Sequence, residues 1–315
     1  MLRLAFVFPG QGSQYVGMGK ELAEHFAEAG KTFEEADEVL GYRLSRVCFE
    51  GPLEELDRTE VTQPAILATS VAAFRVLESQ GIRPHMAAGL SLGEYSALVA
   101  AGALDFASAL RLVAKRGRIM QEAVPEGRGM MAAVMGLDAE AVEEACRESS
   151  QHGVVSIANY NCPGQVAISG EKEAVEDASE RLRQRGGKVV PLAVSVPSHC
   201  LLMKDAAAIF REELKPIDLK RTAFPVIANV TAREMTVDEA KDVLTRQLYS
   251  PVLWEQSVAY MAKQVDYFVE VGPGKVLSAL IKKQARKQVL GNVEDVSSLN
   301  KLLARWKEEA NGQQE

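Results

Sequence analysis

The chain has 315 residues, of which 47% are hydrophobic and 25% are charged, a composition typical of globular proteins. The net charge of -7 at pH 7 disfavours a nucleic-acid partner, and no apolar run approaches the ~20 residues of a membrane-spanning helix. The four cysteines and four histidines lack the spacing of metal ligands, so we expect a cytoplasmic protein without metal, nucleic acid or membrane as a partner. A chain of this length predicts two domains, or one domain with an insertion.

The first 124 residues alternate short apolar strands with amphipathic helices. We predict strands over 4–8 and 85–90, helices over 17–29 and 63–80, and further helices after Ser91 and after Asp105. This alternation indicates a mostly parallel sheet covered by helices. The segment 125–129 (PEGRG) then breaks the pattern and is interpreted as a linker.

A different pattern follows between residues 125 and 196. Strands over 130–136, 154–159, 165–169 and 188–194, with helices over 138–150 and 171–185, give the β-α-β-β-α-β order of a ferredoxin-like unit. The chain then returns to the first pattern, with strands over 223–229 and 267–271 and a charged tail from Leu303 that we expect to fray. We therefore predict an α/β protein whose large domain, 1–124 and 197–315, is interrupted by a small domain, 125–196.

One serine lies between two glycines where a strand is predicted to run into a helix, in Gly89-Leu-Ser-Leu-Gly93. The spacing is that of the nucleophile elbow, in which glycines permit a sharp turn and the helix N-terminus favours an oxyanion. A plain strand-to-helix turn also needs small residues. The pattern alone therefore leaves both interpretations of Ser91 open.

A serine nucleophile needs a base, and histidine is the usual one. His25 lies in an amphipathic helix, His85 begins the strand before the serine, and His152 lies in a connection of the small domain. Elimination favours His199, at the return to the large domain, although a histidine there could merely start a helix. The hydrolase order of serine, acid and late histidine is not followed, and no acidic third member is evident. A backbone carbonyl could orient His199 instead.

One arginine lies on the wrong face of the helix after Asp105. The apolar stripe of that helix contains Ala109, Leu112, Val113, Arg116, Ile119 and Met120. A buried guanidinium without a partner is very unfavourable, so Arg116 needs either an internal carboxylate or the carboxylate of a substrate. Beside an acyl-accepting serine, its two-pronged geometry indicates an acyl chain that ends in a free carboxylate.

Two further features remain ambiguous from the residues alone. The turn after the first strand, Phe8-Pro-Gly-Gln-Gly-Ser-Gln14, lacks the glycine spacing of a dinucleotide loop, and Gln11 could direct its backbone N–H at an oxyanion on the serine or merely complete a turn. The basic clusters 181–188 and 282–287 could be solvated helix faces or docking sites for an acidic partner.

Six motifs in order carry a resemblance over almost the whole chain. They are Phe8-Pro-Gly-Gln-Gly-Ser-Gln14, Gly89-Leu-Ser-Leu-Gly-Glu-Tyr-Ser96, Arg116 with Gly117, Val196-Pro-Ser-His199, Gln247-Leu-Tyr-Ser-Pro251 and Glu270-Val-Gly-Pro-Gly274. Together they resemble the malonyl-CoA:acyl-carrier-protein transacylases of bacterial fatty-acid synthesis. The resemblance implies a hydrolase-like large domain interrupted by a ferredoxin-like one, with the active site in the cleft between them.

The resemblance also implies a role for each matched residue. Ser91 would be the nucleophile, and His199 the base and later the acid. The backbone N–H groups of Gln11 and Leu92 would form the oxyanion hole. The backbone carbonyl of Gln247 would orient His199 in place of an acid.

The same resemblance implies the substrates. Malonyl-CoA and acyl carrier protein would be the partners, Arg116 would bind the malonyl carboxylate, and no cofactor would be needed. The chain departs from the family at Leu90, where a histidine is frequent, and Ser198 lies where related domains vary with the size of the acyl group. A serine thioesterase or esterase is the alternative activity, and a carrier-docking scaffold with an inactive site is a third.

Overall fold

The computed structural model describes residues 2–125, 127–192, 194 and 196–312. Its strands form two five-stranded sheets. The first is parallel, with β10 (Val289–Val293), β9 (Tyr267–Val271), β1 (Leu4–Phe8), β2 (Met86–Gly89) and β7 (Val226–Ile227) in this spatial order. The second is largely antiparallel, in the order β6 (Lys188–Pro191), β3 (Gly129–Met135), β5 (Gln165–Glu171), β4 (Val155–Cys162) and β8 (Val252–Leu253).

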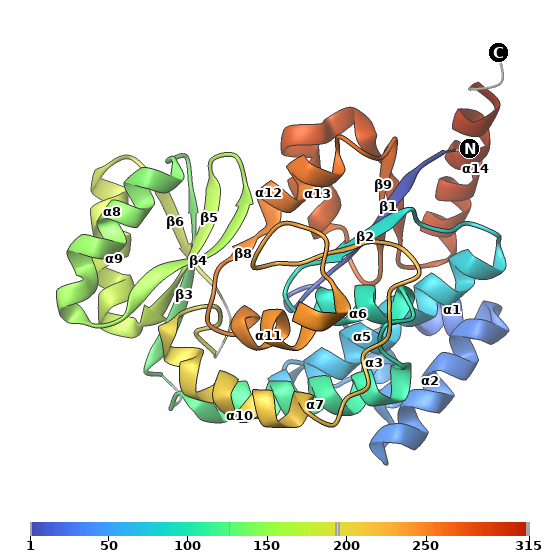
Figure 1. The fold of residues 1–315 in the computed structure, drawn as a ribbon, viewed down its shortest axis with the longest axis horizontal. Coiled ribbons are helices and arrows are strands. Elements are labelled where there is room, and N and C mark those ends of the chain that lie inside the picture. The colour runs from blue at the N-terminus through green and yellow to red at the C-terminus, as the bar shows by residue number, and fades with distance from the viewer. Residues whose placement is uncertain (1, 126, 193, 195, 313–315) are drawn as a thin grey trace.

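The helices cover both sheets. Those before the second sheet are α1 (Lys20–His25), α2 (Ala27–Leu40), α3 (Leu44–Glu50), α4 (Leu53–Leu56), α5 (Thr59–Ser79), α6 (Gly93–Ala100) and α7 (Phe106–Ala123). The second sheet carries α8 (Ala139–Ser149) and α9 (Lys172–Gln184), and it lies with them at one end of the molecule in Figure 1. The later helices are α10 (Lys204–Leu214), α11 (Val237–Gln247), α12 (Trp254–Met261), α13 (Val276–Ala285) and α14 (Val296–Gly312).

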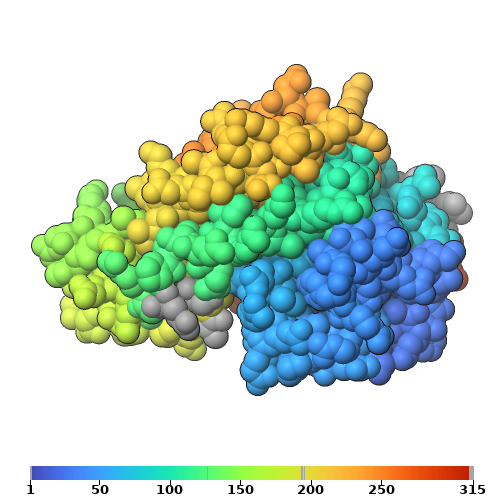
Figure 2. Space-filling view, turned by 90° about the horizontal axis from the view of Figure 1, so that it is seen from below, coloured from blue at the N-terminus to red at the C-terminus, as the bar shows by residue number. Residues whose placement is uncertain are grey.

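The central strand of the parallel sheet, β1, consists entirely of apolar residues (LAFVF). All five residues of β1 are buried, because the strand lies in the middle of the sheet and is covered on both faces. On the face shown in Figure 2, α7 and α10 lie side by side, and the N-terminal helices lie beyond α7. No helix in the described ranges combines the length and the apolar character that crossing a membrane would require.

The register of β1 and β2 brings two loops together. Phe8 pairs with Gly89, so both strands end at the same level and their following loops leave the sheet side by side. Strand β7, next to β2, ends close to the same edge, since Ala88 pairs with Ile227. Ligand-binding groups gather at the carboxyl ends of strands in parallel sheets. The sheet therefore positions the segments that follow β1, β2 and β7 at one edge.

Several sequence predictions are confirmed and others need correction. The strands over 4–8 and 267–271 have the predicted bounds. The single helix over 17–29 is wrong, because Phe26 is extended and separates α1 from α2. Of the strand predicted over 223–229, only Val226–Ile227 forms one. The strand predicted over 188–194 ends at Pro191, and residue 193 lies outside the described residues.

The part of the C-terminal tail that the structure describes, up to Gly312, is helical and does not fray as predicted. Helix α14 continues to Gly312, beyond the predicted fraying point at Leu303. Leu302 is buried, Trp306 packs against the core, and the Tyr267 hydroxyl donates to the Glu309 carboxylate. The charged residues of the tail occupy the exposed side of an amphipathic helix, which explains why composition alone was misleading.

The sequence pattern did not predict β8. This short strand comes from beyond residue 196 and pairs in parallel with β4, with Asn159 opposite Val252. The second sheet is therefore completed by a segment that follows residue 196, where the chain has already returned to the first sheet at β7.

Candidate active site

The candidate active site begins at the turn after β2. Ser91 has a φ of 52°, in the left-handed region that strains a non-glycine residue. Helix α6 starts at Gly93, immediately after this turn. A Cβ atom on Gly89 would lie 1.8 Å from the carbonyl carbon of Gly93, and one on Gly93 would lie 2.1 Å from the carbonyl oxygen of Phe8. The two glycines are therefore required for the close approach of the backbones, as in a nucleophile elbow.

His199 lies within hydrogen-bonding distance of Ser91. Its Nε2 is 2.8 Å from Ser91 Oγ, and its Nδ1 is 2.7 Å from the carbonyl oxygen of Gln247. Because a carbonyl only accepts, Nδ1 carries the ring proton, and Nε2 is free to accept the hydroxyl proton of the serine. His199 also has a positive φ, 62°, and its backbone N–H donates to Leu248 O at 2.9 Å. The structure thus brings together the serine, the histidine and the carbonyl that the sequence analysis selected.

Two causes make this imidazole a weak base. Burial, and then the charge of Arg116, lower the pKa of His199 to about 4, and the hydrogen bond to Gln247 offsets this only in part. The ring is therefore neutral at pH 7. A neutral ring with a free Nε2 lone pair is the form that can take the proton of Ser91.

Arg116 extends from α7 into the interior and is 1% exposed, as its position in the apolar stripe predicts. Its Nη1 donates to Gln63 Oε1 at 2.9 Å, and its Nη2 donates to Gln247 Oε1 at 2.9 Å and to Ser91 Oγ at 3.3 Å. The guanidinium also lies over the Tyr95 ring, 5.5 Å from its centroid. The groups bonded to the guanidinium are thus amide and hydroxyl oxygens, and among the residues that the structure describes no carboxylate occupies the fork.

One buried acid, Glu94, is linked to Arg116 by hydrogen bonds through Gln247. Glu94 is fully buried, and its Oε2 accepts a hydrogen bond from Gln247 Nε2, which also donates to Ser91 O at 2.9 Å. Burial raises the pKa of Glu94 to about 7, against the opposing effect of its hydrogen bonds. Because the Gln247 NH2 group faces Glu94, the Gln247 Oε1 must face Arg116. Sequence reasoning missed Glu94, although a glutamate in an alanine-rich, otherwise apolar helix was a usable signal.

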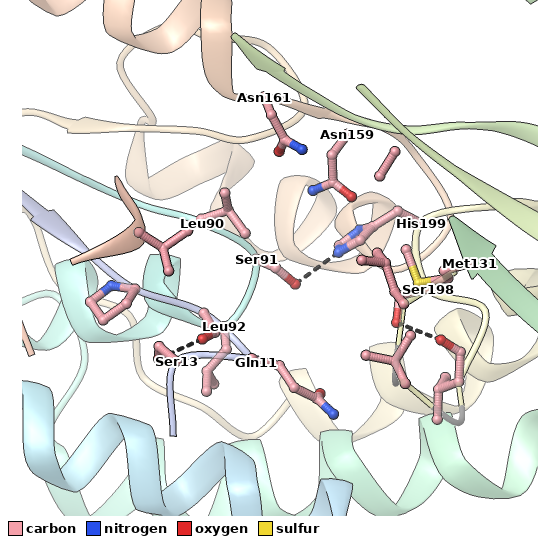
Figure 3. A pocket seen from close by; sticks show the side chains of 18 of the residues that line it. Gln11, Ser13, Leu90, Ser91, Leu92, Met131, Asn159, Asn161, Ser198 and His199 are labelled. Carbon is pink, nitrogen blue, oxygen red and sulfur yellow. Dashed lines mark hydrogen bonds between the residues drawn. The ribbon is translucent and has the colours of Figure 1, made fainter. Parts of the chain in front are cut away.

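Gln11 and Leu92 lie beside Ser91 in the same cavity. Leu92 is the N-cap residue of α6, where backbone N–H groups have no partner within the helix. The Gln11 side chain donates to Thr59 Oγ1 at 3.4 Å and points away from Ser91 in Figure 3. The Gln11 side-chain amide is thus directed away from the nucleophile. That the backbone N–H groups of Gln11 and Leu92 form an oxyanion hole stays a prediction.

A cavity of about 290 Å³ opens at the serine and histidine. The second sheet contributes amide side chains to it, and Figure 3 shows those of Asn159 and Asn161 directed toward the Ser91–His199 pair. Apolar side chains also line the cavity, among them Leu90, Val276, Leu277 and Leu280. Within the described residues, no group of three or more His, Cys, Asp or Glu side chains is arranged to hold a metal ion. The site therefore offers nucleophilic and acid–base chemistry in a slot between the two sheets.

Comparison with known proteins identifies the family. The acyl transferase domain family matches residues 5–315. A malonyl CoA-acyl carrier protein transacylase of Escherichia coli is 53% identical over 287 residues, which are 90% of this chain and 93% of that protein. The chain belongs to the malonyl-CoA:acyl-carrier-protein transacylase family.

Solved structures agree with this family membership. The crystal structure of a malonyl CoA-acyl carrier protein transacylase from Clostridium perfringens is similar with a TM-score of 0.96 and 42% identity, covering 99% of this chain and 100% of that one. A second similar structure is a malonyl-transacylase in complex with a type II PKS acyl-carrier protein. Its TM-score is 0.93 and its identity 48%, covering 96% of this chain and 99% of that one.

The two basic clusters differ in this transacylase-family chain. In the cluster 181–188, Arg181 and Arg185 both form ion pairs with Glu148, so part of its charge is neutralised internally. Lys282 and Lys283 lie in the last turn of α13, the helix whose first turn lines the cavity. The second cluster is therefore connected to the site by a single helix.

Proposed function

We propose that this protein transfers the malonyl group from malonyl-CoA to the phosphopantetheine thiol of acyl carrier protein, supplying extender units for fatty-acid synthesis. The observation that carries the proposal is the convergence of a base and a cation on one nucleophilic oxygen. His199 Nε2 lies 2.8 Å and Arg116 Nη2 3.3 Å from Ser91 Oγ. A nucleophile, a base and a cation that no carboxylate of the described residues pairs with suit an acyl group that carries its own carboxylate. Membership of the transacylase family supports the same substrates.

The first half of the reaction acylates the enzyme. His199 Nε2 takes the hydroxyl proton while Ser91 Oγ attacks the thioester carbonyl, and the carbonyl oxygen becomes an oxyanion. The backbone N–H groups of Gln11 and Leu92 stabilise that oxyanion, and one such donor contributes about 3 kcal/mol to the transition state. The C–S bond then breaks, and the coenzyme A thiolate takes the proton from His199. A malonyl ester on Ser91 remains.

Arg116 selects the acyl group. Its Nη2 contact with Ser91 Oγ is long, and it is released when that oxygen becomes part of an ester. The released N–H, with an N–H of Nη1, makes a two-pronged grip on the malonyl carboxylate. Gln63 and Gln247 accept hydrogen bonds from the same two nitrogens, so they hold the plane of the guanidinium during this exchange.

The second half reverses the first with a new thiol. The phosphopantetheine thiol of the carrier gives its proton to His199 and attacks the ester carbonyl. The Ser91 oxygen leaves and takes the proton back from Nε2, which regenerates the free enzyme. This ping-pong order needs no metal or cofactor, because the histidine serves as base and as acid in turn.

We also propose that the protein acts in the cytoplasm and has a hydrolase-like large domain, 1–124 and 197–315, interrupted by a ferredoxin-like small domain, 125–196. The β-α-β-β-α-β order from β3 to β6 supports the small domain, and the parallel sheet with its elbow supports the large one. The cavity lined from both sheets then lies between the two domains.

Intact mass spectrometry after brief exposure to malonyl-CoA tests the proposal. We expect a malonyl adduct on the wild-type protein, no adduct on Ser91→Ala, and transfer of the adduct to carrier thiol when holo-carrier is added. Rapid release of free malonate, without transfer to carrier, would establish the alternative thioesterase activity. Absence of any adduct on the wild type would favour a non-catalytic carrier-docking role.

A further inference from the structure

The side chain of Asn229 bridges the strained turn that carries the nucleophile. Asn229 follows β7 and is 1% exposed. Its Nδ2 donates to the carbonyl oxygen of Gly89 at 2.6 Å, and its Oδ1 accepts from the backbone N–H of Ser91 at 2.7 Å. The orientation of the amide follows from these partners, because a carbonyl needs a donor and an N–H needs an acceptor. One side chain thus bonds the peptide groups on both sides of Leu90.

The backbone of Asn229 is fixed as firmly as its side chain. Its N–H donates to Glu94 Oε1 at 3.0 Å, and its carbonyl accepts from the Leu253 N–H at 2.8 Å. Every polar atom of Asn229 therefore has a partner. Those partners come from three separate segments: the elbow, helix α6 and strand β8.

The loop that presents Asn229 is itself strained. Among the described residues, three non-glycine positions have a positive φ, namely Ser91, His199 and Ala232. Ala232 lies in a tight loop in which its N–H donates to Ala228 O at 2.9 Å, and the Ala228 N–H donates to Arg233 O at 2.8 Å. Such strain persists only where the surroundings over-determine the backbone, and it concentrates at functional sites. The three strained positions here belong to the nucleophile, the base and the loop that holds the nucleophile.

We propose that Asn229 is a positioning residue that holds Ser91 in its left-handed conformation and so keeps Ser91 Oγ within hydrogen-bonding distance of His199 Nε2. This inference rests on the proposed function. Without the amide, the Gly89 carbonyl and the Ser91 N–H lose their buried partners, and the turn relaxes toward an unstrained φ that moves Oγ away from the imidazole. Gln63 and Gln247 accept hydrogen bonds from the Arg116 fork. The Asn229 side chain is linked to the fork through Ser91, whose Oγ accepts the long Nη2 contact that acylation releases. The Asn229 backbone N–H is linked to it through Glu94 and Gln247. Asn229 therefore acts on the rate of acylation and leaves recognition of the carboxylate intact.

The test compares two substitutions at this position. Asn229→Ala removes both side-chain bonds, whereas Asn229→Asp keeps an acceptor for the Ser91 N–H and loses the donor to Gly89 O. Single-turnover acylation of Ser91 is followed by rapid quench and intact mass spectrometry over a range of malonyl-CoA concentrations. We expect the maximal rate to fall about 100-fold in Asn229→Ala, the scale of a misplaced reacting group, and less in Asn229→Asp. The concentration for half-maximal rate should change less than about threefold in both.

Asn292→Ala is the matched control. Asn292 lies in β10, and its side-chain amide donates hydrogen bonds to the carbonyl oxygen of Gly274 and to the Glu294 carboxylate, away from the elbow. It should acylate at the wild-type rate. Thermal unfolding of each variant shows which fraction is folded, and rates are compared per folded molecule. If Asn229→Ala does not fold, Asn229→Asp decides by the same criteria.

The outcomes separate the two proposals. A wild-type protein that malonyl-CoA does not acylate would refute the proposed function. A wild type that is acylated, together with an Asn229 variant that reaches the same maximal rate, would refute the positioning role alone. A variant whose loss lies wholly in the half-saturating concentration would also refute it.

Discussion

Replacing Arg116 by alanine should abolish preference for malonyl over acetyl groups. We assign two charge-assisted hydrogen bonds to the malonyl carboxylate, and such bonds contribute about 1.5–3 kcal/mol each. A loss of about 4 kcal/mol corresponds to about 10³ in kcat/KM for malonyl-CoA, at about 1.4 kcal/mol per tenfold. Acetyl-CoA has no carboxylate, so it loses only the long 3.3 Å contact between Arg116 Nη2 and Ser91 Oγ. We expect acetyl transfer to stay within about tenfold of the wild type, since that contact is weak.

The assay measures transfer to carrier thiol for malonyl-CoA and acetyl-CoA side by side. Arg118→Ala is the control, because Arg118 is an exposed arginine two residues further along α7 and on its opposite face. Arg116→Ala also leaves the amide oxygens of Gln63 and Gln247 without their donor, which lowers stability. Unfolding curves are therefore recorded for each variant, and rates are normalised to folded protein.

Equal losses for the two acyl groups would refute the reasoning. They would mean that Arg116 supports the nucleophile or the fold and does not read the substrate carboxylate. A preserved malonyl preference in Arg116→Ala would have the same consequence, because another residue would then have to bind the carboxylate.

Three further predictions concern the base, the carrier and the C-terminal helix. The kcat/KM for malonyl transfer should be lost only toward pH 4, where His199 becomes protonated and cannot accept the serine proton. Protonation of Glu94, whose pKa is about 7, leaves the His199 lone pair free, so a complete loss of activity near 6.5 would contradict this. Lys282→Glu with Lys283→Glu should raise the KM for carrier several-fold at low salt, with the difference vanishing at high salt, whereas Lys301→Glu on α14 should not. Trp306→Ala should lower the free energy of unfolding by about 2 kcal/mol, less than for a fully buried tryptophan, as measured by urea denaturation; no change would mean that α14 does not pack on the core.

The parts of the site that sequence predicted are those with a local signature. The glycine spacing around Ser91 is a pattern of five consecutive residues, although the contacts that require Gly93 include Phe8 on the neighbouring strand. Arg116 stood out because one helical stripe was otherwise apolar. His199 could be predicted as the base by eliminating the other histidines, because the chain has only four. Each of these signals lies within one element or in the composition.

The parts that sequence missed depend on contacts between distant segments. Asn229 meets the elbow only because β7 lies next to β2, and nothing in its own neighbourhood marks it. The strand β8 has two residues and exists only through its pairing with β4. Helix α14 is different, because Leu299, Leu302 and Trp306 have helical spacing that its charged composition concealed.

The orientation of His199 by a carbonyl bears on how a transferase resists water. Burial, and then the charge of Arg116, lower the pKa of His199 to about 4. A carboxylate partner would stabilise the protonated ring against both effects, whereas the neutral Gln247 carbonyl does so less. A base this weak can take a proton from a thiol of pKa about 8.5 far more readily than from water, whose pKa is about 15.7. If His199 is the base, as we propose, we expect it to favour a thiol over water as the acceptor of the acyl group. The serine hydroxyl also gives up its proton with difficulty, so we expect acylation to depend on Oγ staying within hydrogen-bonding distance of Nε2. This is the contact that we propose the Asn229 amide maintains.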